Sequence, residues 1–143
     1  MLLENYLIAD DPVGRRIRDL LIARARAGVH VALIHDWFGT LGNADRAFFA
    51  PLRVAGVAVR AFNPPRLESP LGWIGRDHRK LLVADGHAGS ISGVCIAAKW
   101  LGDAAHGIAP WRDSGVMIEG PAVADIEGAF RDSWTGLGAP LPF

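Results

Sequence analysis

The segment Asp77–Gly86 reads DHRKLLVADG, and its last two residues form the Asp-Gly pair that most strongly marks a β-hairpin. One apolar run precedes this pair, and a second continues beyond it to Ile96. Side chains two residues apart on a strand share a face, so we expect His78 and Lys80 to point the same way and Arg79 the opposite way. The segment therefore predicts a hairpin whose first strand carries an imidazole beside an ammonium group.

Upstream of this segment, strand and helix signals alternate. Asp11 followed by Pro12 is typical of a helix start, because Asp caps the first turn and proline fits its first position. The alternation predicts a parallel core sheet, with His35 and Asp36 at a strand end where open α/β sheets hold ligands. The expected strands are Leu2–Ile8, Val29–Ile34 and Val57–Phe62, and the expected helices run from Pro12 to Gly28 and from the cap Asn43 to Val54.

On either side of the hairpin lie a long loop and a final strand and helix. Residues 63–76 are rich in Pro and Gly and contain apolar side chains, which favours a lid beside a site. A short strand is expected at Gly115–Glu119, and Pro121 opens the last helix. One face of that helix is apolar, with Val123, Ile126, Phe130 and Trp134 at helical spacing.

Composition narrows the class of protein. The chain has 143 residues and is 50% hydrophobic, which fits one domain over residues 1–143. Lys plus Arg and Asp plus Glu number 15 each, so the chain lacks the basic excess that favours nucleic acid. Cys95 is the single cysteine and is expected to be a buried thiol. We find no signal peptide and no apolar run of ~20 residues, which favours a cytoplasmic protein or one that meets a membrane from the side.

The pairing of His78 with Lys80 suits phosphate chemistry. Imidazole is nucleophilic near neutral pH, and an ammonium group can neutralise the non-bridging oxygens as phosphorus becomes five-coordinate. This chemistry requires neither a metal nor another cofactor. Because H-x-K alone occurs often by chance, the hypothesis depends on the longer pattern around it.

That longer pattern is H-x-K-x4-D over residues 78–85, followed by the small pair Ser92-Gly93. Further matching stretches are Glu4-Asn5-Tyr6, residues 28–31 and Pro110-Trp111-Arg112-Asp113. With these features the chain resembles the phospholipase D superfamily, whose signature is called the HKD motif, and most of all the amino-terminal half of the bacterial cardiolipin synthase branch. The resemblance implies an α/β fold in which a mixed β-sheet is flanked by helices on both faces, as a single HKD domain.

The resemblance also implies roles for individual residues. His78 is the expected nucleophile, which forms a phosphohistidine, and Lys80 is expected to bind the phosphate. Asp113 is expected to orient the histidine ring. Asp85 belongs to the signature, but its place in the hairpin turn gives it an equally good structural role. Candidate substrate-binding residues are Ser92, Cys95 and Arg76, and Cys95 stands where the family pattern has Asn.

The family uses two such motifs for each site, one histidine attacking while the other protonates the leaving group, and this sequence contains one. The resemblance therefore implies a homodimer or a second HKD half, acting on phosphatidylglycerol or a related phospholipid at the inner face of a bacterial membrane. Two alternatives remain, a non-catalytic phosphate-binding half-domain and a small dimeric nuclease, the latter disfavoured by the neutral net charge. The remaining histidines lack a lysine two residues on and are expected to be structural or exposed: His30, His35, His87 and His106.

Overall fold

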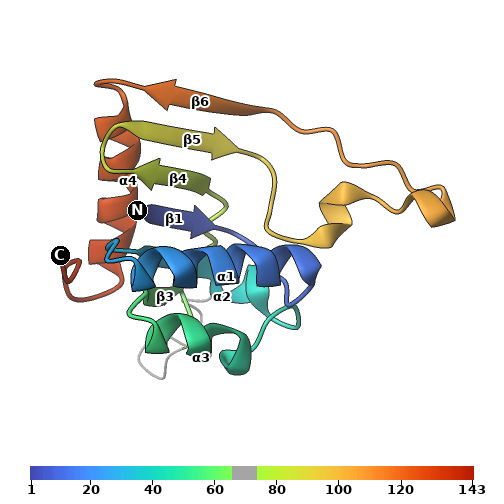
Figure 1. Cartoon of the computed structure of the whole chain (residues 1–143), viewed down its shortest axis with the longest axis horizontal. Coiled ribbons are helices and arrows are strands. Elements are labelled where there is room, and N and C mark those ends of the chain that lie inside the picture. Colours follow the sequence, from blue (N-terminus) through green and yellow to red (C-terminus); the bar gives the residue numbers. More distant parts are fainter. Residues whose placement is uncertain (66–73) are drawn as a thin grey trace.

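A computed structural model describes residues 1–65 and 74–143 and contains a six-stranded mixed sheet (Figure 1). The strand order is β3-β2-β1-β4-β5-β6. Strands β1, β2 and β3 pair in parallel, whereas β4, β5 and β6 follow as antiparallel neighbours. The strands are β1 (Leu2–Asn5), β2 (Ala32–Asp36), β3 (Ala58–Phe62), β4 (Lys80–Ala84), β5 (Ala88–Ser92) and β6 (Gly115–Glu119). The expected parallel core is thus confirmed for the first three strands, and the expected mixed sheet for the whole.

Helices cover both faces of the sheet, as expected. Helix α1 (Pro12–Arg26) and helix α3 (Arg46–Val54) pack on one face, and α4 (Val123–Gly136) packs on the other (Figure 1). The predicted apolar face of α4 is buried, with Val123, Phe130 and Trp134 each at most 2% exposed. At roughly 1.5–3 kcal/mol for each large side chain, this face is a main source of stability on its side of the sheet. The short helices α2 (Trp37–Thr40), η2 (Ala98–Leu101) and η3 (Ala104–His106) were not expected from sequence.

Local signals fixed the start of α1 correctly but misplaced the start of α3. Asp11 accepts hydrogen bonds from two main-chain N–H groups of the first turn of α1, at 2.9 Å each. The cap of α3 is Asp45, not Asn43, and it accepts from Ala47 N at 2.8 Å. Asn43 instead donates its side-chain amide to two carbonyl oxygens of the preceding turn, at 3.2 and 3.3 Å. Asn and Asp are both good caps, so spacing to the apolar face had to decide between them.

The hairpin predicted at Asp85-Gly86 is present between β4 and β5. Asp85 and Gly86 have φ of +53° and +64°, the left-handed pair that a tight hairpin turn requires, and His87 N donates to Ala84 O at 3.0 Å. Strand β1 is shorter than expected and ends at Asn5, while Ile8 forms only an isolated bridge with Ile96. Most of the predicted lid, residues 66–73, lies outside the described residues.

At one end of the sheet, the last residues of some strands lie beside the first residues of another strand that runs in the opposite direction. The carboxyl ends of β1, β2 and β3 lie there, and so does the start of β4, because β4 is antiparallel to β1. Asn5 at the end of β1 is therefore paired with Lys80 at the start of β4. The segment that connects β5 and β6 extends well beyond the sheet from this same end (Figure 1).

Candidate active site

His78 and Lys80 stand at the start of β4, and their polar ends meet. Lys80 Nζ lies 3.3 Å from His78 Nδ1 and donates to the His78 carbonyl oxygen at 2.6 Å. The ring of Tyr6 packs against both, with its centroid 4.5 Å from the centroid of the His78 ring and 5.4 Å from Lys80 Nζ. Lys80 is 5% exposed, whereas His78 is exposed. A fixed cation thus adjoins an accessible imidazole, as the spacing predicts, although His78 precedes the strand rather than belonging to it.

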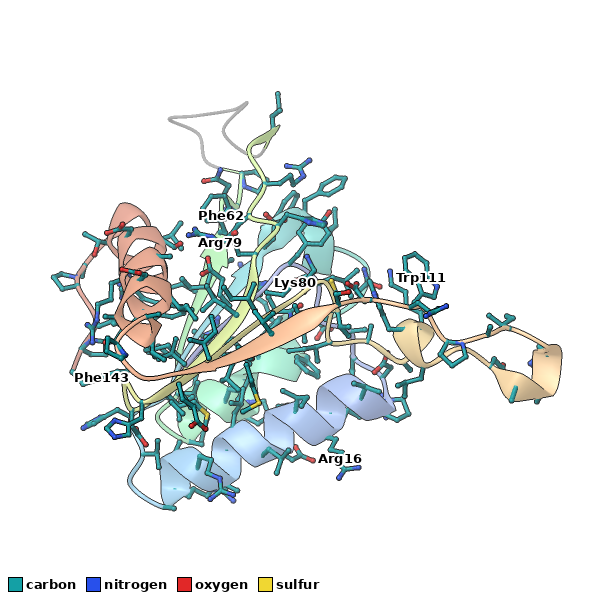
Figure 2. All side chains as sticks on the ribbon, turned by 90° about the horizontal axis from the view of Figure 1, so that it is seen from above. Arg16, Phe62, Arg79, Lys80, Trp111 and Phe143 are labelled. Atoms are coloured by element: carbon teal, nitrogen blue, oxygen red, sulfur yellow. The ribbon has the colours of Figure 1, made fainter. Side chains whose placement is uncertain are left out.

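Arg79 points to the other side of the sheet, toward α4. Its Nη1 donates to Ala129 O at 3.1 Å, and its Nη2 donates to the Ser133 hydroxyl. Figure 2 shows Arg79 near α4 and Lys80 farther from that helix. The alternation of side chains therefore assigns one cation of the segment to each face of the sheet.

A cavity of about 490 Å³ opens beside Lys80 on the α1 side of the sheet. Asn5, Ser92 and Cys95 line it near the lysine, and apolar residues of α1 and β4 form much of the remaining wall. Cys95 is buried, as expected, and burial raises the pKa of its thiol above the ordinary value of 9.0. The thiol is consequently protonated at neutral pH and is not a substitute for the two amide donors of an asparagine.

Asp113 lies next to the small pair that follows the hairpin. A Cβ at Gly93 would overlap the carboxylate of Asp113, so glycine at this position is what lets the carboxylate approach. One oxygen of Asp113 accepts from Ser114 N at 2.7 Å. Arg76 stacks its guanidinium group over the ring of Phe38, 4.0 Å from the ring centroid.

Asp85, the remaining residue of the expected catalytic group, lies apart from His78 and Lys80. Asp85 is exposed in the hairpin turn with a left-handed backbone, at the opposite end of β4 from Lys80. Five residues of extended chain separate the two by roughly 16 Å, which is too far for a shared phosphate. The structure does not bring Asp85 to the site, and its position supports the structural role that the turn suggested.

Asp36 anchors the main chain that leads into His78, and sequence reasoning did not single it out for this role. Its Oδ2 accepts from Asp77 N at 2.8 Å, while its Oδ1 accepts from Gly39 N at 2.8 Å and so caps α2. Gly39 in turn makes room for Tyr6, since a Cβ there would overlap the Tyr6 carbonyl oxygen. The available signal was the position of Asp36 at the carboxyl end of a buried strand.

The other histidines have local partners or lie at the surface. His35 stacks on Phe49 with 4.3 Å between ring centroids, and burial lowers its pKa to about 4. His30 stacks on Phe143, and His106 pairs with Asp103 at 2.7 Å. His87 is exposed beside the hairpin turn. These positions agree with the structural interpretation of all four.

Two comparisons connect this geometry with known proteins. The chain is 34% identical over 148 residues to cardiolipin synthase A of Pseudomonas fluorescens, a match covering 99% of the chain and 29% of that relative. It is 35% identical over 133 residues to the cardiolipin synthase of Alkalihalophilus pseudofirmus, covering 92% and 26% respectively. The chain is homologous to part of the cardiolipin synthases. It spans about a quarter of the length of these relatives.

The fold gives a second likeness. The chain matches the crystal structure of polyphosphate kinase from Porphyromonas gingivalis with a TM-score of 0.58 and 15% identity, over 99% of the chain and 22% of the kinase. At this identity the likeness concerns the fold alone, which resembles a phospholipase D-like domain. No family model matches the chain. The homology and the fold together confirm the resemblance drawn from the sequence.

Large apolar side chains are exposed on the segment that connects β5 and β6. Within residues 1–65 and 74–143, no helix has the length and apolar character needed to span a bilayer. Between β5 and β6, several large apolar side chains face solvent (Trp111 is labelled in Figure 2): Leu101, Ile108 and Trp111 are 54–65% exposed.

Proposed function

We propose that the chain supplies one half of a phosphodiester-transfer site, in which His78 attacks phosphorus and Lys80 binds the non-bridging oxygens. The observation that carries the proposal is the distance of 3.3 Å between Lys80 Nζ and His78 Nδ1, with the lysine buried and the imidazole accessible. An ammonium group held this close to a nucleophile stabilises the charge that develops on a five-coordinate phosphorus.

The proton positions suggest an order of events. Lys80 has only donors, so in the resting site His78 Nδ1 accepts from it and the ring proton of a neutral imidazole sits on Nε2. A phosphate that draws Lys80 onto its own oxygens frees Nδ1 to carry the proton, which leaves the Nε2 lone pair available for attack. We propose Asp113 as the carboxylate that orients the ring in this state.

The chemistry then proceeds in two balanced steps. The Nε2 lone pair forms a bond to phosphorus, the phosphorus–oxygen ester bond breaks, and the leaving oxygen takes a proton from an acid on the opposite side. Water or an alcohol next attacks phosphorus and gives its proton to the same group, and the phosphorus–nitrogen bond breaks. In-line geometry asks for a second motif facing His78, from a second copy of the chain or from another HKD half.

Homology to cardiolipin synthases favours a phospholipid as the substrate, reached from the cytoplasm or from the inner face of a bacterial membrane. The exposed apolar side chains between β5 and β6 would support peripheral contact with the bilayer. Neutral net charge makes nucleic acid a weaker candidate. Cys95 in place of Asn favours the alternative, a phosphate-binding half-domain without turnover.

The test is incubation of the chain with vesicles of radiolabelled phosphatidylglycerol, followed by measurement of product and of label bound to protein. We expect His78→Asn to abolish turnover and to remove an acid-labile, base-stable label, because the nucleophile is gone. His87→Asn changes an exposed histidine outside the site and should leave both unchanged. Label that persists in His78→Asn would refute the nucleophile. Phosphate binding without turnover in the wild type would support the half-domain instead.

A further inference from the structure

Behind His78, on the α4 side of the sheet, two carboxyl groups are buried together. Glu4 on β1 is 1% exposed, and Asp77, which precedes His78, is 5% exposed. A side-chain hydrogen bond between the two carboxyl groups contributes to the pKa shift of each. Arg79 contacts both, with its Nη2 3.3 Å from Glu4 Oε1 and its Nε 3.1 Å from Asp77 Oδ1.

If both acids were ionised, the cluster would contain buried acceptor oxygens that have no hydrogen-bond donor. Both oxygens of Glu4 and Oδ2 of Asp77 are buried and accept no hydrogen bond from the described residues. Two adjacent buried carboxylates would also place two negative charges against the one guanidinium group of Arg79, whose side chain is 44% exposed. A single proton on Glu4, donated to Asp77, removes both problems, because it supplies the missing donor and leaves one anion paired with one cation.

We infer that Glu4 is a neutral carboxylic acid that donates to Asp77 and thereby positions the main chain presenting His78 and Lys80. Asp77 is the connecting group, because its Oδ1 accepts from both the main-chain N and the Nε of Arg79 at 3.1 Å. Its own N–H is held by Asp36 at 2.8 Å. The residues on either side of His78 are therefore fixed from behind the sheet. Glu4 is a positioning residue, and the inference depends on the proposed function only in taking His78 as the reacting group.

The electrostatic environment agrees with this assignment. Burial raises the pKa of Glu4 to about 8, with a further contribution from Asp77, against the lowering effects of Arg79 and of a hydrogen bond with Ser133. Burial alone would raise the pKa of Asp77 as well. Hydrogen bonds from Glu4 and from the main chain and side chain of Arg79 outweigh it and hold that pKa below its usual range. The pair is thus divided into one acid that keeps its proton and one that does not.

Other elements packed against Glu4 bring few charged groups to it. From α4, Ser133 accepts from Arg79 and donates to Ala129 O at 3.1 Å. On β3, Arg60 is two strands away in the same row, where it donates to Trp134 O at 2.7 Å and stacks on that ring. The other charged residues of α4 are largely solvent-facing, and two of them pair with each other: Asp125, Glu127, Arg131 and Asp132, with 2.7 Å between Arg131 and Glu127.

The decisive experiment is a pH titration of the wild-type chain labelled with ¹³C at the glutamate side-chain carboxyl carbons and followed by NMR. The signal of Glu4 is assigned by its disappearance in Glu4→Gln, with Glu119→Gln as the matched exposed control. We expect Glu4 to remain protonated through neutral pH, with its midpoint near 8 rather than near ~4.3. A Glu4 carbon that titrates with the ordinary glutamates would overturn the inference.

A second readout separates positioning from simple structural support. We expect the ring signals of His78 to shift as Glu4 loses its proton in the wild type. Glu4→Gln, whose neutral amide can still donate to Asp77, should show no such step. A His78 signal that is indifferent to Glu4 ionisation would refute the positioning role even if Glu4 titrates high. Because neither measurement uses turnover, an inactive chain with a high Glu4 midpoint would count against the proposed function alone.

Discussion

Raising the pH from 6.5 to 8 should destabilise the wild-type chain but not Glu4→Gln. The folded state keeps a proton on Glu4, whose pKa rises from 4.5 to about 8, and the unfolded state releases it above 4.5. Between these values the folded state binds more protons, so stability falls as pH rises, by up to ~1.4 kcal/mol per pH unit. The stabilising contribution is complete below pH 4.5 and is lost as the pH approaches 8.

The contribution of His35 to stability changes with pH in the opposite direction over part of this range. Burial lowers its pKa from 6.5 to about 4, so between those values the unfolded state binds the extra proton and stability rises with pH. The two slopes nearly cancel from pH 4.5 to 6.5. Above pH 6.5 only the Glu4 contribution remains, and 1.5 pH units correspond to about 2 kcal/mol. Asp77 titrates below this window and Cys95 above it.

The assay is urea unfolding at half-unit pH steps from 5 to 8.5, followed by tryptophan fluorescence. The unfolding free energy of the wild type should be nearly constant up to pH 6.5 and should then fall by about 2 kcal/mol by pH 8. The unfolding free energy of Glu4→Gln should rise by about 2 kcal/mol from pH 5 to pH 6.5, because only the His35 contribution is left, and should then level off. Glu119→Gln, at an exposed position, should follow the wild type. A Glu4→Gln curve that still falls above pH 6.5 would refute the reasoning.

Two further substitutions test how the site is held. Asp11→Ala removes the cap of α1 and the hydrogen bond from Ala98 N, and should lower the free energy of unfolding in urea by about 1–2 kcal/mol. The control Asp10→Ala, at an exposed ion pair, should change it by less than ~0.5 kcal/mol. Gly93→Ala should displace the Asp113 carboxylate and lower turnover or phosphate affinity with little loss of fold, and an unchanged site would remove Asp113 from it. Gly128→Ala, in open space within α4, is the control and should stabilise by up to ~1 kcal/mol.

The elements that the sequence predicts correctly are those whose signals are local. The cap and proline at Asp11-Pro12, the turn at Asp85-Gly86 and the apolar face of α4 each depend on residues within a few positions of one another. Strand limits were less accurate, because pairing with a neighbouring strand decides where a strand ends. Asn43 failed as a cap for a related reason, since the turn before α3 already uses its amide.

For the site, the strand period was sufficient to bring His78 and Lys80 together, and the resemblance supplied their roles. It could not supply the contacts from distant parts of the chain. Asp36 holds Asp77 across 41 residues, and Glu4 reaches Asp77 only because β1 lies beside β4 in the folded sheet. Nothing in the order of residues reveals which carboxylate will face which. The same limit explains Asp85, which belongs to the signature yet lies at the far end of its strand.

The two faces of the sheet differ in how their buried charges are balanced, and this difference supports the proposed phosphodiester substrate. On the α4 side, Asp77 balances Arg79 if Glu4 carries its proton as we infer, so these three side chains together have no net charge. On the α1 side, Lys80 is 5% exposed, and no carboxylate of the described residues lies within 4 Å of its ammonium group. A buried cation without an opposite charge beside it is costly, and one negative charge is enough to neutralise it. A phosphodiester carries that single charge, and in the proposed mechanism its phosphorus would lie beside His78. With Arg79 fully engaged behind the sheet, Lys80 alone in this segment is available to receive it.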